Sequence, residues 1–203
     1  MLTVGKDAAG VEELLSSGRL ACPACGEGLR GWGHARRRLV RGPGEGRWWL
    51  RPRRARCPEC GRTHVLLPVS VLARRADTAT VIGTALAVAA AGLGHRKAAE
   101  QAGRPAATVR GWLRRFASRA EALRAAFTLV VCALDPDPPL PAPAGSPAGD
   151  AVAAIVAAAA AARRRWGGGA LVLSPWELAA AVTGGRLLAP GPGVEVINTS
   201  CPW

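Results

Sequence analysis

Two short cysteine motifs constrain this 203-residue chain more than any other feature of its sequence. Each motif reads Cys-Pro-x-Cys-Gly, once at residues 22–26 and again at residues 57–61. Such a motif bends the backbone so that two thiolates converge, and four thiolates at about 2.3 Å form a closed tetrahedral zinc site. The sequence therefore predicts a structural Zn²⁺ ion, with no open catalytic position, bound by Cys22, Cys25, Cys57 and Cys60.

Disulfides or unpaired core thiols are the alternative to a metal site. Residues 1–7 contain no apolar signal-peptide segment, so we expect a cytoplasmic protein whose thiols stay reduced, which favours the metal. His64, four residues after Cys60, is an alternative ligand that would replace one thiolate. Cys132 and Cys201 have no partner at ligand spacing, and we expect both to be incidental.

The 31 residues between the two motifs are more than a minimal zinc ribbon needs, and they predict a long β-hairpin. Its turn is the glycine-rich segment 42–46, between two extended-looking runs at 34–41 and 47–56. Tryptophans are interleaved with the arginines of this segment, at Trp32, Trp48 and Trp49. We expect at least one to pack over the cysteine motifs, and stacking on nucleic-acid bases is the alternative.

The chain carries 27 Lys and Arg against 14 Asp and Glu, a net charge of +13. Residues 30–75 contain 13 basic residues and two acidic ones, whereas residues 125–203 contain four basic and five acidic ones. A surplus of positive charge confined to one part of the chain favours a polyanionic binding partner, and double-stranded DNA is the expected one. A merely solvated basic face is the alternative.

Residues 95–119 have the pattern of a helix-turn-helix motif. A short helix is predicted at 95–102, followed by Gly103 where a tight turn needs positive φ. A second helix is predicted at 106–119, with Pro105 tolerated at its start. The apolar helix 78–93 would complete a trihelical domain.

In a helix-turn-helix the second helix enters the major groove of DNA. The predicted contacts are Arg96, which positions the first helix, Thr108 and Arg110, which read base edges, and Arg104, Arg114 and Arg115, which hold phosphates.

These patterns together predict a mainly α protein with a small β zinc ribbon. Four segments are expected: an N-terminal helix and zinc ribbon at 1–76, a helix-turn-helix domain at 77–125, a Pro-rich linker at 126–149 and an Ala-rich helical segment at 150–203. The C-terminal helices would either dock on the upstream domain or dimerise, and the last six residues would form a frayed tail. The uncharged run at 78–94 is too short and too rich in Ala and Gly for a membrane span, so we expect none.

Residues 56–68 and 94–115 resemble a poorly characterised bacterial family that combines a zinc ribbon with a helix-turn-helix, some of whose members occur in transposon-like settings. The same order is similar to the N-terminal DNA-recognition regions of transposases. The resemblance implies DNA binding and the four cysteine ligands. The chain departs from transposases in its later carboxylates, which lie in Pro-rich or Ala-rich context and do not suggest a two-metal active site: Asp135, Asp137, Asp150, Glu177 and Glu195.

We therefore expect a zinc-stabilised, non-enzymatic, nucleoid-associated DNA-binding protein, either a transcriptional regulator or an accessory recognition protein of a transposon. It would act as a homodimer or with a transposase partner. Two alternatives stay open: an adaptor whose zinc ribbon binds a polymerase or a transposase, and an inactive transposase-derived fragment. The sequence indicates neither the DNA target nor the oligomeric state.

Overall fold

The computed structural model describes residues 1–167 and 173–189, and it has mixed α and β structure. The expectation of a mainly α chain with a small β ribbon holds in part, because the strands form a four-stranded sheet and a separate two-stranded sheet beside the helices. The strands are β1 (Leu2–Val4), β2 (Arg30–His34), β3 (Arg38–Arg41), β4 (Arg47–Leu50), β5 (Arg53–Arg56) and β6 (Thr63–Pro68). The helices of the described residues are α1 (Ala8–Ser16), α2 (Ala79–Ala90), α3 (His95–Ala102), α4 (Ala106–Ala117), α5 (Ala120–Leu134), α6 (Pro147–Trp166) and α7 (Pro175–Val182).

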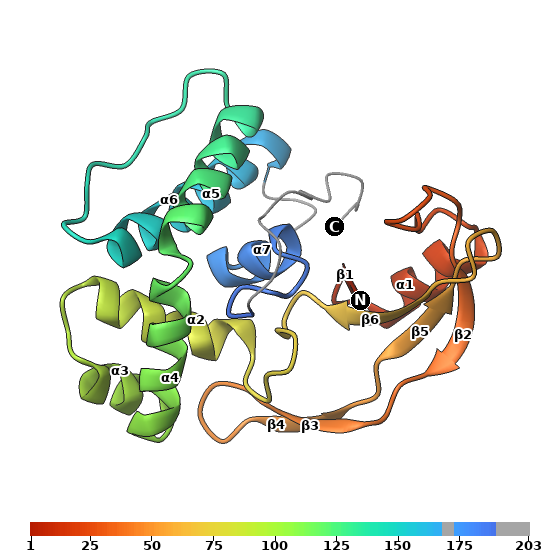
Figure 1. Cartoon of the computed structure of the whole chain (residues 1–203), viewed down its shortest axis with the longest axis horizontal. Helices are drawn as coiled ribbons and strands as arrows, with labels where there is room; N and C mark the ends of the chain where they lie inside the picture. The colour runs from red at the N-terminus through yellow and green to blue at the C-terminus, as the bar shows by residue number, and fades with distance from the viewer. Residues whose placement is uncertain (168–172, 190–203) are drawn as a thin grey trace.

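The ribbon lobe is a four-stranded sheet in the order β1-β6-β5-β2, with α1 against it (Figure 1). β5 runs antiparallel to both β6 and β2, whereas β1 pairs parallel with β6. Helix α1 begins after Asp7, whose carboxylate accepts hydrogen bonds from two amides of the first turn. Its apolar side chains Val11 and Leu15 are buried in one cluster with Cys22, Cys57 and Leu66. This lobe therefore has a small apolar core of its own that includes two of the cysteines.

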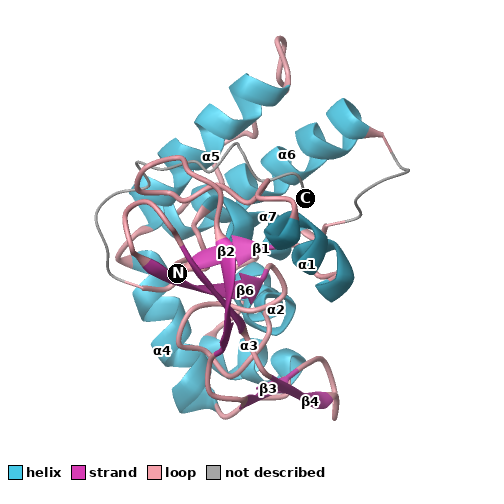
Figure 2. Cartoon of the chain, turned by 90° about the vertical axis from the view of Figure 1, so that its right-hand side faces the viewer, coloured by secondary structure: helices cyan, strands magenta, loops and turns pink. Residues whose placement is uncertain are grey.

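A two-stranded arm, defined as β3, β4 and the turn 42–46, extends from the ribbon lobe. It confirms the predicted hairpin, with Arg41 opposite Arg47 at the turn and Arg38 opposite Leu50 at the base. Figures 1 and 2 both place the arm at the same end of the molecule as α3 and α4, opposite α5 and α6. The basic residues of the arm and those of α4 therefore belong to one end of the protein.

The helical lobe is built around α2, which contacts α3, α4, α6 and α7. Helix α3 ends at Gly103 in the left-handed conformation (φ 61°), as the turn prediction required. The side of α4 that faces the core carries Val109, Trp112 and Phe116, all buried. Helices α2, α3 and α4 thus pack against one another around the turn at Gly103, and one side of α4 faces solvent.

The C-terminal helices pack on this lobe. One buried cluster joins side chains of α2, α4, α5, α6 and α7, including Phe116, Phe127, Ile155 and Leu178. The expected domain boundary at residue 125 falls inside α5, so the irregular Pro-rich segment is confined to about residues 135–146. We expected these helices either to dock on the upstream domain or to dimerise. In the described structure α6 and α7 dock on α2.

Among the described residues, no helix combines the length and the apolar character needed to cross a membrane. The expected frayed tail, together with Cys201 and Glu195, lies outside the described residues.

Candidate metal centre and nucleic-acid interface

The two cysteine motifs adopt the same backbone geometry. In the first, the Gly26 amide donates to the Cys22 carbonyl at 2.8 Å, and in the second the Gly61 amide donates to the Cys57 carbonyl at 3.1 Å. Both glycines have positive φ, 80° and 69°. A side chain would be strained in that conformation, which explains why glycine follows the second cysteine of each motif.

The four sulfur atoms lie within 4.8 Å of one another. Sγ of Cys22 is 3.7 Å from Sγ of Cys60, and Sγ of Cys25 is 3.4 Å from Sγ of Cys57. A tetrahedron with metal–sulfur bonds of about 2.3 Å has edges of about 3.8 Å. The cluster therefore has the dimensions of a four-thiolate metal site, with Cys22 and Cys57 buried and Cys25 and Cys60 facing solvent.

Hydrogen bonds among the closely spaced cysteines shift the pKa values of two thiols in opposite directions. The Cys60 amide, helped by hydrogen bonds from its neighbours, lowers the pKa of Cys57 to about 7. The Glu27 amide acts to lower the pKa of Cys25, but hydrogen bonding to Cys57, burial and the other two cysteines outweigh it and raise that pKa to about 12. Four adjacent thiolates need a cation to offset their mutual repulsion.

His64 lies beside this cluster rather than within it. Its imidazole is buried, and Nε2 is 3.6 Å from Sγ of Cys22. Burial, together with the chain's amino terminus and Arg62, lowers the pKa of His64, so the ring is neutral at pH 7. The four thiols converge without His64, and its position suits an N–H donor to the Cys22 sulfur.

Most of the predicted DNA-contact residues lie at the exposed surface of α3 and α4. Arg96, Arg110, Arg114 and Arg115 are exposed, and Thr108 is half-buried. Arg115 bends back to donate to the Gly111 carbonyl of its own helix at 2.9 Å. The structure therefore brings three arginines together on the side of α4 that faces away from the core.

Arg104 differs from these residues because its side chain is only 9% exposed. Its Nε donates to Asp77 at 2.6 Å, and its Nη2 donates to the Gly42 carbonyl in the turn of the arm at 2.7 Å. The expectation that Arg104 holds a DNA phosphate therefore does not fit its position. Its guanidinium instead joins the turn between α3 and α4 to the arm.

Asp77 accepts a second hydrogen bond, from Nη2 of Arg41 at 2.8 Å. Backbone bonds strengthen the same contact, since the Arg41 amide donates to the Ala76 carbonyl at 2.7 Å and the Thr78 amide donates to the Arg41 carbonyl at 3.0 Å. Sequence reasoning missed Asp77, although it is the one acidic residue between Glu59 and Glu100. An isolated carboxylate within a basic segment is a signal that could have identified this contact.

The three tryptophans of the basic segment do not pack over the cysteine motifs. Trp32, Trp48 and Trp49 are 50%, 42% and 59% exposed. Guanidinium groups cover two of them: Arg56 lies 4.9 Å from the Trp32 ring centre, and Arg37 lies 4.3 Å from that of Trp49. The expectation that at least one tryptophan covers the metal site is therefore corrected.

Of the four described carboxylates that the sequence singled out after α4, three have separate partners, and Asp137 is exposed. Asp135 pairs with Arg164 at 2.7 Å, Asp150 accepts from the Ala144 amide at 2.6 Å, and Glu177 pairs with Lys6 at 3.0 Å. Within residues 1–167 and 173–189, the four cysteines are the one group of three or more His, Cys, Asp or Glu that converges as metal ligands do.

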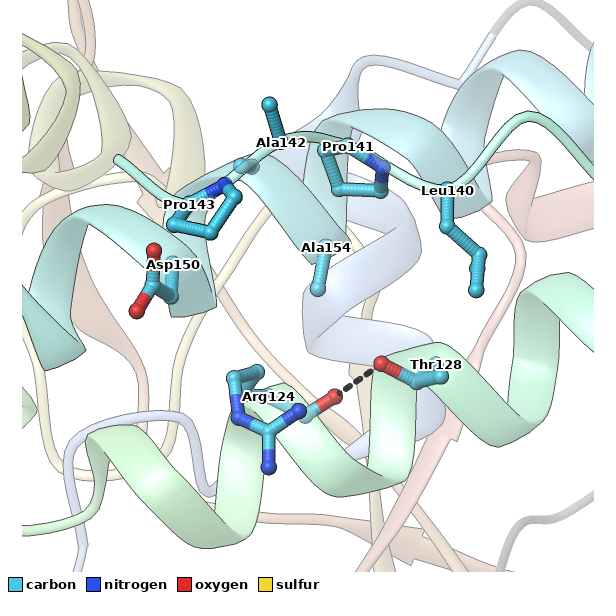
Figure 3. Close-up of a pocket in the computed structure, with 9 residues that line it drawn as sticks. Arg124, Thr128, Leu140, Pro141, Ala142, Pro143, Asp150 and Ala154 are labelled. Atoms are coloured by element: carbon cyan, nitrogen blue, oxygen red, sulfur yellow. Dashed lines mark hydrogen bonds between the residues drawn. The ribbon is translucent and has the colours of Figure 1, made fainter. Parts of the chain in front are cut away.

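A hollow of about 260 Å³ lies between α5, α6 and the Pro-rich segment (Figure 3). Its charged lining residues already have partners: Arg124 is paired with Glu121, and Asp150 holds the Ala144 amide. Thr128 also bonds within its own helix, to the Arg124 carbonyl at 2.9 Å, as the dashed line in Figure 3 marks. The hollow therefore offers no converging set of free polar groups.

Comparison with known proteins adds one relationship. The family described as Domain of unknown function (DUF6431) matches residues 22–112. No curated protein and no solved structure matches the chain. The matched segment begins at the first cysteine of the metal centre and includes the arm, α2, α3 and the first half of α4. Over this segment, the chain is similar to a protein family whose function is unknown.

Proposed function

We propose that this chain is a zinc-stabilised protein that binds double-stranded DNA. In this proposal α3, the turn at Gly103 and α4 form a helix-turn-helix, with α2 as its third helix. The single observation that carries the proposal is the two-sided character of α4, which buries Val109, Trp112 and Phe116 and exposes Arg110, Arg114 and Arg115. A helix of this kind can lie in the major groove, where arginine reads guanine and holds phosphates.

The metal centre belongs to the ribbon lobe, from which the arm extends. Four sulfur ligands at tetrahedral spacing favour zinc, and they leave no position for water. The ion would therefore supply folding energy to a lobe whose apolar core is small. Cys22, Cys25, Cys57 and Cys60 would hold it, and His64 would orient Cys22.

The arm extends the proposed DNA surface beyond α4. The arm carries three arginines and the flanking residues 30–37 and 51–56 carry seven more, against Glu45 as the single acidic residue of 30–56. Because Asp77 and Arg104 fix the arm beside the turn between α3 and α4, both elements can touch one duplex. Affinity would come mostly from arginine–phosphate contacts, which fall steeply with salt.

We propose a non-enzymatic role, as a transcriptional regulator or as an accessory recognition protein of a transposon. Two observations support it: the separate partners of Asp135, Asp150 and Glu177, and a metal centre with four protein ligands. A protein with this role would be associated with the nucleoid.

The test is a selection of genomic fragments bound by the full chain at physiological salt, followed by binding curves for variants on the selected site. Arg110→Ala should weaken binding about 5- to 100-fold, the effect of losing one base-edge contact. Arg163→Ala is the matched control, because Arg163 is also exposed but lies near the C-terminal end of α6. Equal effects of the two substitutions would contradict the proposed role of α4. Failure to select any duplex would favour the adaptor alternative.

A further inference from the structure

Three tryptophans that are each about half exposed, all in one short basic segment, are unusual for a surface that contacts only water. An indole buries a large apolar area when it finds a partner, and contiguous exposed apolar groups mark interaction sites. Trp49 is the most exposed of the three, at 59%, and lies in the arm. The other exposed tryptophan of the described residues, Trp166, lies at the end of α6, away from the basic segment.

The register of the arm assigns its side chains to two faces. Leu39 is opposite Trp49 and Arg41 is opposite Arg47, so these four residues share one face, which we name the Trp49 face. Val40 lies on the other face and is fully buried, whereas Leu39 is 37% exposed. The Trp49 face therefore presents an indole and a leucine side by side, next to two arginines.

A cation–π contact holds the indole of Trp49 in place. The guanidinium carbon of Arg37 lies 4.3 Å from the ring centre. Trp32 has the same arrangement with Arg56 at 4.9 Å on the neighbouring sheet. An aromatic surface whose ring orientation is fixed before binding loses little entropy when a second flat ring stacks on it.

The charge of this surface selects its occupant. Arg37 lies over the Trp49 ring, and Arg47 is exposed on the same face. Arg36 and Arg51 are exposed neighbours in the sequence. The buried carboxylate of Asp77 is engaged by Arg41 and Arg104, and the nearest acidic residue in the sequence is Glu45 at the turn. An occupant needs flat apolar groups joined by a chain of negative charges. DNA with unpaired bases has both, whereas an intact duplex hides the faces of its bases in the stack.

We propose that the Trp49 face of the arm is a stacking site for unpaired DNA bases. This inference rests on the proposed function, because the arm would meet such bases beside the duplex that α4 holds. The chain would then favour sites where a duplex adjoins single-stranded or opened DNA. Stacking is tolerant of sequence, so this contact would add affinity for the DNA conformation and not for a particular base.

The test compares two fluorescently labelled oligonucleotides of about 12 nucleotides, a thymidine homopolymer and a base-free deoxyribose-phosphate chain of equal length and charge. The unsubstituted protein should bind the thymidine oligonucleotide at least about 10-fold more tightly. Trp49→Ala should remove most of that preference, and Trp49→Phe should keep it because the aromatic face remains. Trp166→Ala is the matched control and should change nothing. Thermal unfolding of each variant checks that it is folded. We expect all of them to fold, because Trp49 and Trp166 are both exposed.

Equal binding of the two oligonucleotides by the unsubstituted protein would overturn the inference, and so would a preference that survives in a folded Trp49→Ala variant. Duplex binding by the same proteins separates this outcome from failure of the proposed function. A chain that binds duplex through Arg110 but shows no preference for bases has the proposed function without the stacking site. A chain that prefers bases but binds no duplex has the stacking site without the helix-turn-helix function.

Discussion

The buried carboxylate of Asp77 accepts a hydrogen bond from Nε of Arg104 at 2.6 Å, across 27 residues of sequence. Both side chains are almost fully enclosed, at 4% and 9% exposed. The same carboxylate holds Arg41, and the same guanidinium holds the Gly42 carbonyl. One ion pair therefore fixes the position of the arm relative to α3 and α4, and with it the relation between the two basic surfaces.

Replacing Asp77 by Asn should lower the free energy of unfolding by about 3–5 kcal/mol, because Arg104 would keep its charge without a buried partner. Urea unfolding followed by circular dichroism measures this change. Glu121→Gln is the control, since Glu121 pairs with Arg124 at the surface and its loss should cost about 1 kcal/mol or less. Similar values for the two variants would show that the buried pair does not fix the arm.

Removing the metal should unfold the ribbon lobe and leave the helical lobe folded. The buried apolar cluster around Cys22 and Cys57 shares no residue with the cluster around α2. Elemental analysis should give one zinc per chain, and a strong chelator should abolish the dispersed NMR signals of about residues 1–66 while most helical circular dichroism remains.

Two cysteine substitutions provide the comparison for the metal experiment. Cys57→Ser should abolish zinc binding, whereas Cys132→Ser, at an exposed position of α5, should leave it at one ion per chain. A metal-free protein with an unchanged NMR spectrum would refute the structural role of the ion.

Gly83→Ala should destabilise the protein, because a Cβ atom at Gly83 would overlap the indole of Trp176. We expect a loss of about 1–3 kcal/mol as α7 is forced away from α2. Gly111→Ala is the control in another helix: there the new Cβ meets only the flexible end of Arg115, and alanine should stabilise α4 by about 0.5–1 kcal/mol. If Gly83→Ala were also stabilising, α7 would not be packed on α2.

Glu177→Gln should weaken the start of α7 in a pH-dependent way. Burial acts to raise the pKa of Glu177, but hydrogen bonds from Ser174 and the contact with Lys6 outweigh it and hold the pKa below its usual value. The ionised carboxylate therefore stabilises the fold above the unfolded-state pKa of about 4.3, and this contribution is lost as the pH falls through the lowered folded-state pKa.

At pH 7 the difference in unfolding free energy between the unsubstituted protein and Glu177→Gln should be about 0.5–2 kcal/mol. It should shrink toward zero in acid as the Glu177 carboxylate is protonated. Metal loss in acid acts in the same direction, because it would unfold the ribbon lobe that holds Lys6, the partner of Glu177. Glu13→Gln, which removes an exposed pair with Arg19, should show a difference near zero throughout. A Glu177→Gln difference that grows in acid would mean that the ionised carboxylate does not stabilise the start of α7.

The parts of the fold that the sequence predicts are those with local signals. Glycine following each cysteine pair, the glycine-rich turn of the arm and Gly103 after α3 each mark a backbone conformation that other residues adopt with strain. The helix predicted at 106–119 has the predicted start and ends two residues earlier, at Ala117. Ser174 before Pro175 is likewise a local signal for the start of α7.

The parts that the sequence did not reveal depend on contacts between distant segments. Strand β1 has three residues and exists through its parallel pairing with β6, more than 60 residues away. The pairing of Asp77 with Arg104 and the packing of Trp176 on Gly83 also join distant segments. The spacing of apolar residues along the sequence therefore does not predict them. The exposure of Trp49 follows from the arm leaving the ribbon lobe, which composition alone could not show.

Duplex binding as a function of salt tests the central claim most directly. If Arg110, Arg114 and Arg115 act with the arm on one duplex and neutralise about five phosphates, the logarithm of the binding constant should fall against the logarithm of salt with a slope of about −4.5. Arg114→Ala should reduce that slope by about one, while Arg163→Ala should not change it. A flat salt dependence, or equal slopes for the unsubstituted protein and Arg114→Ala, would contradict the account.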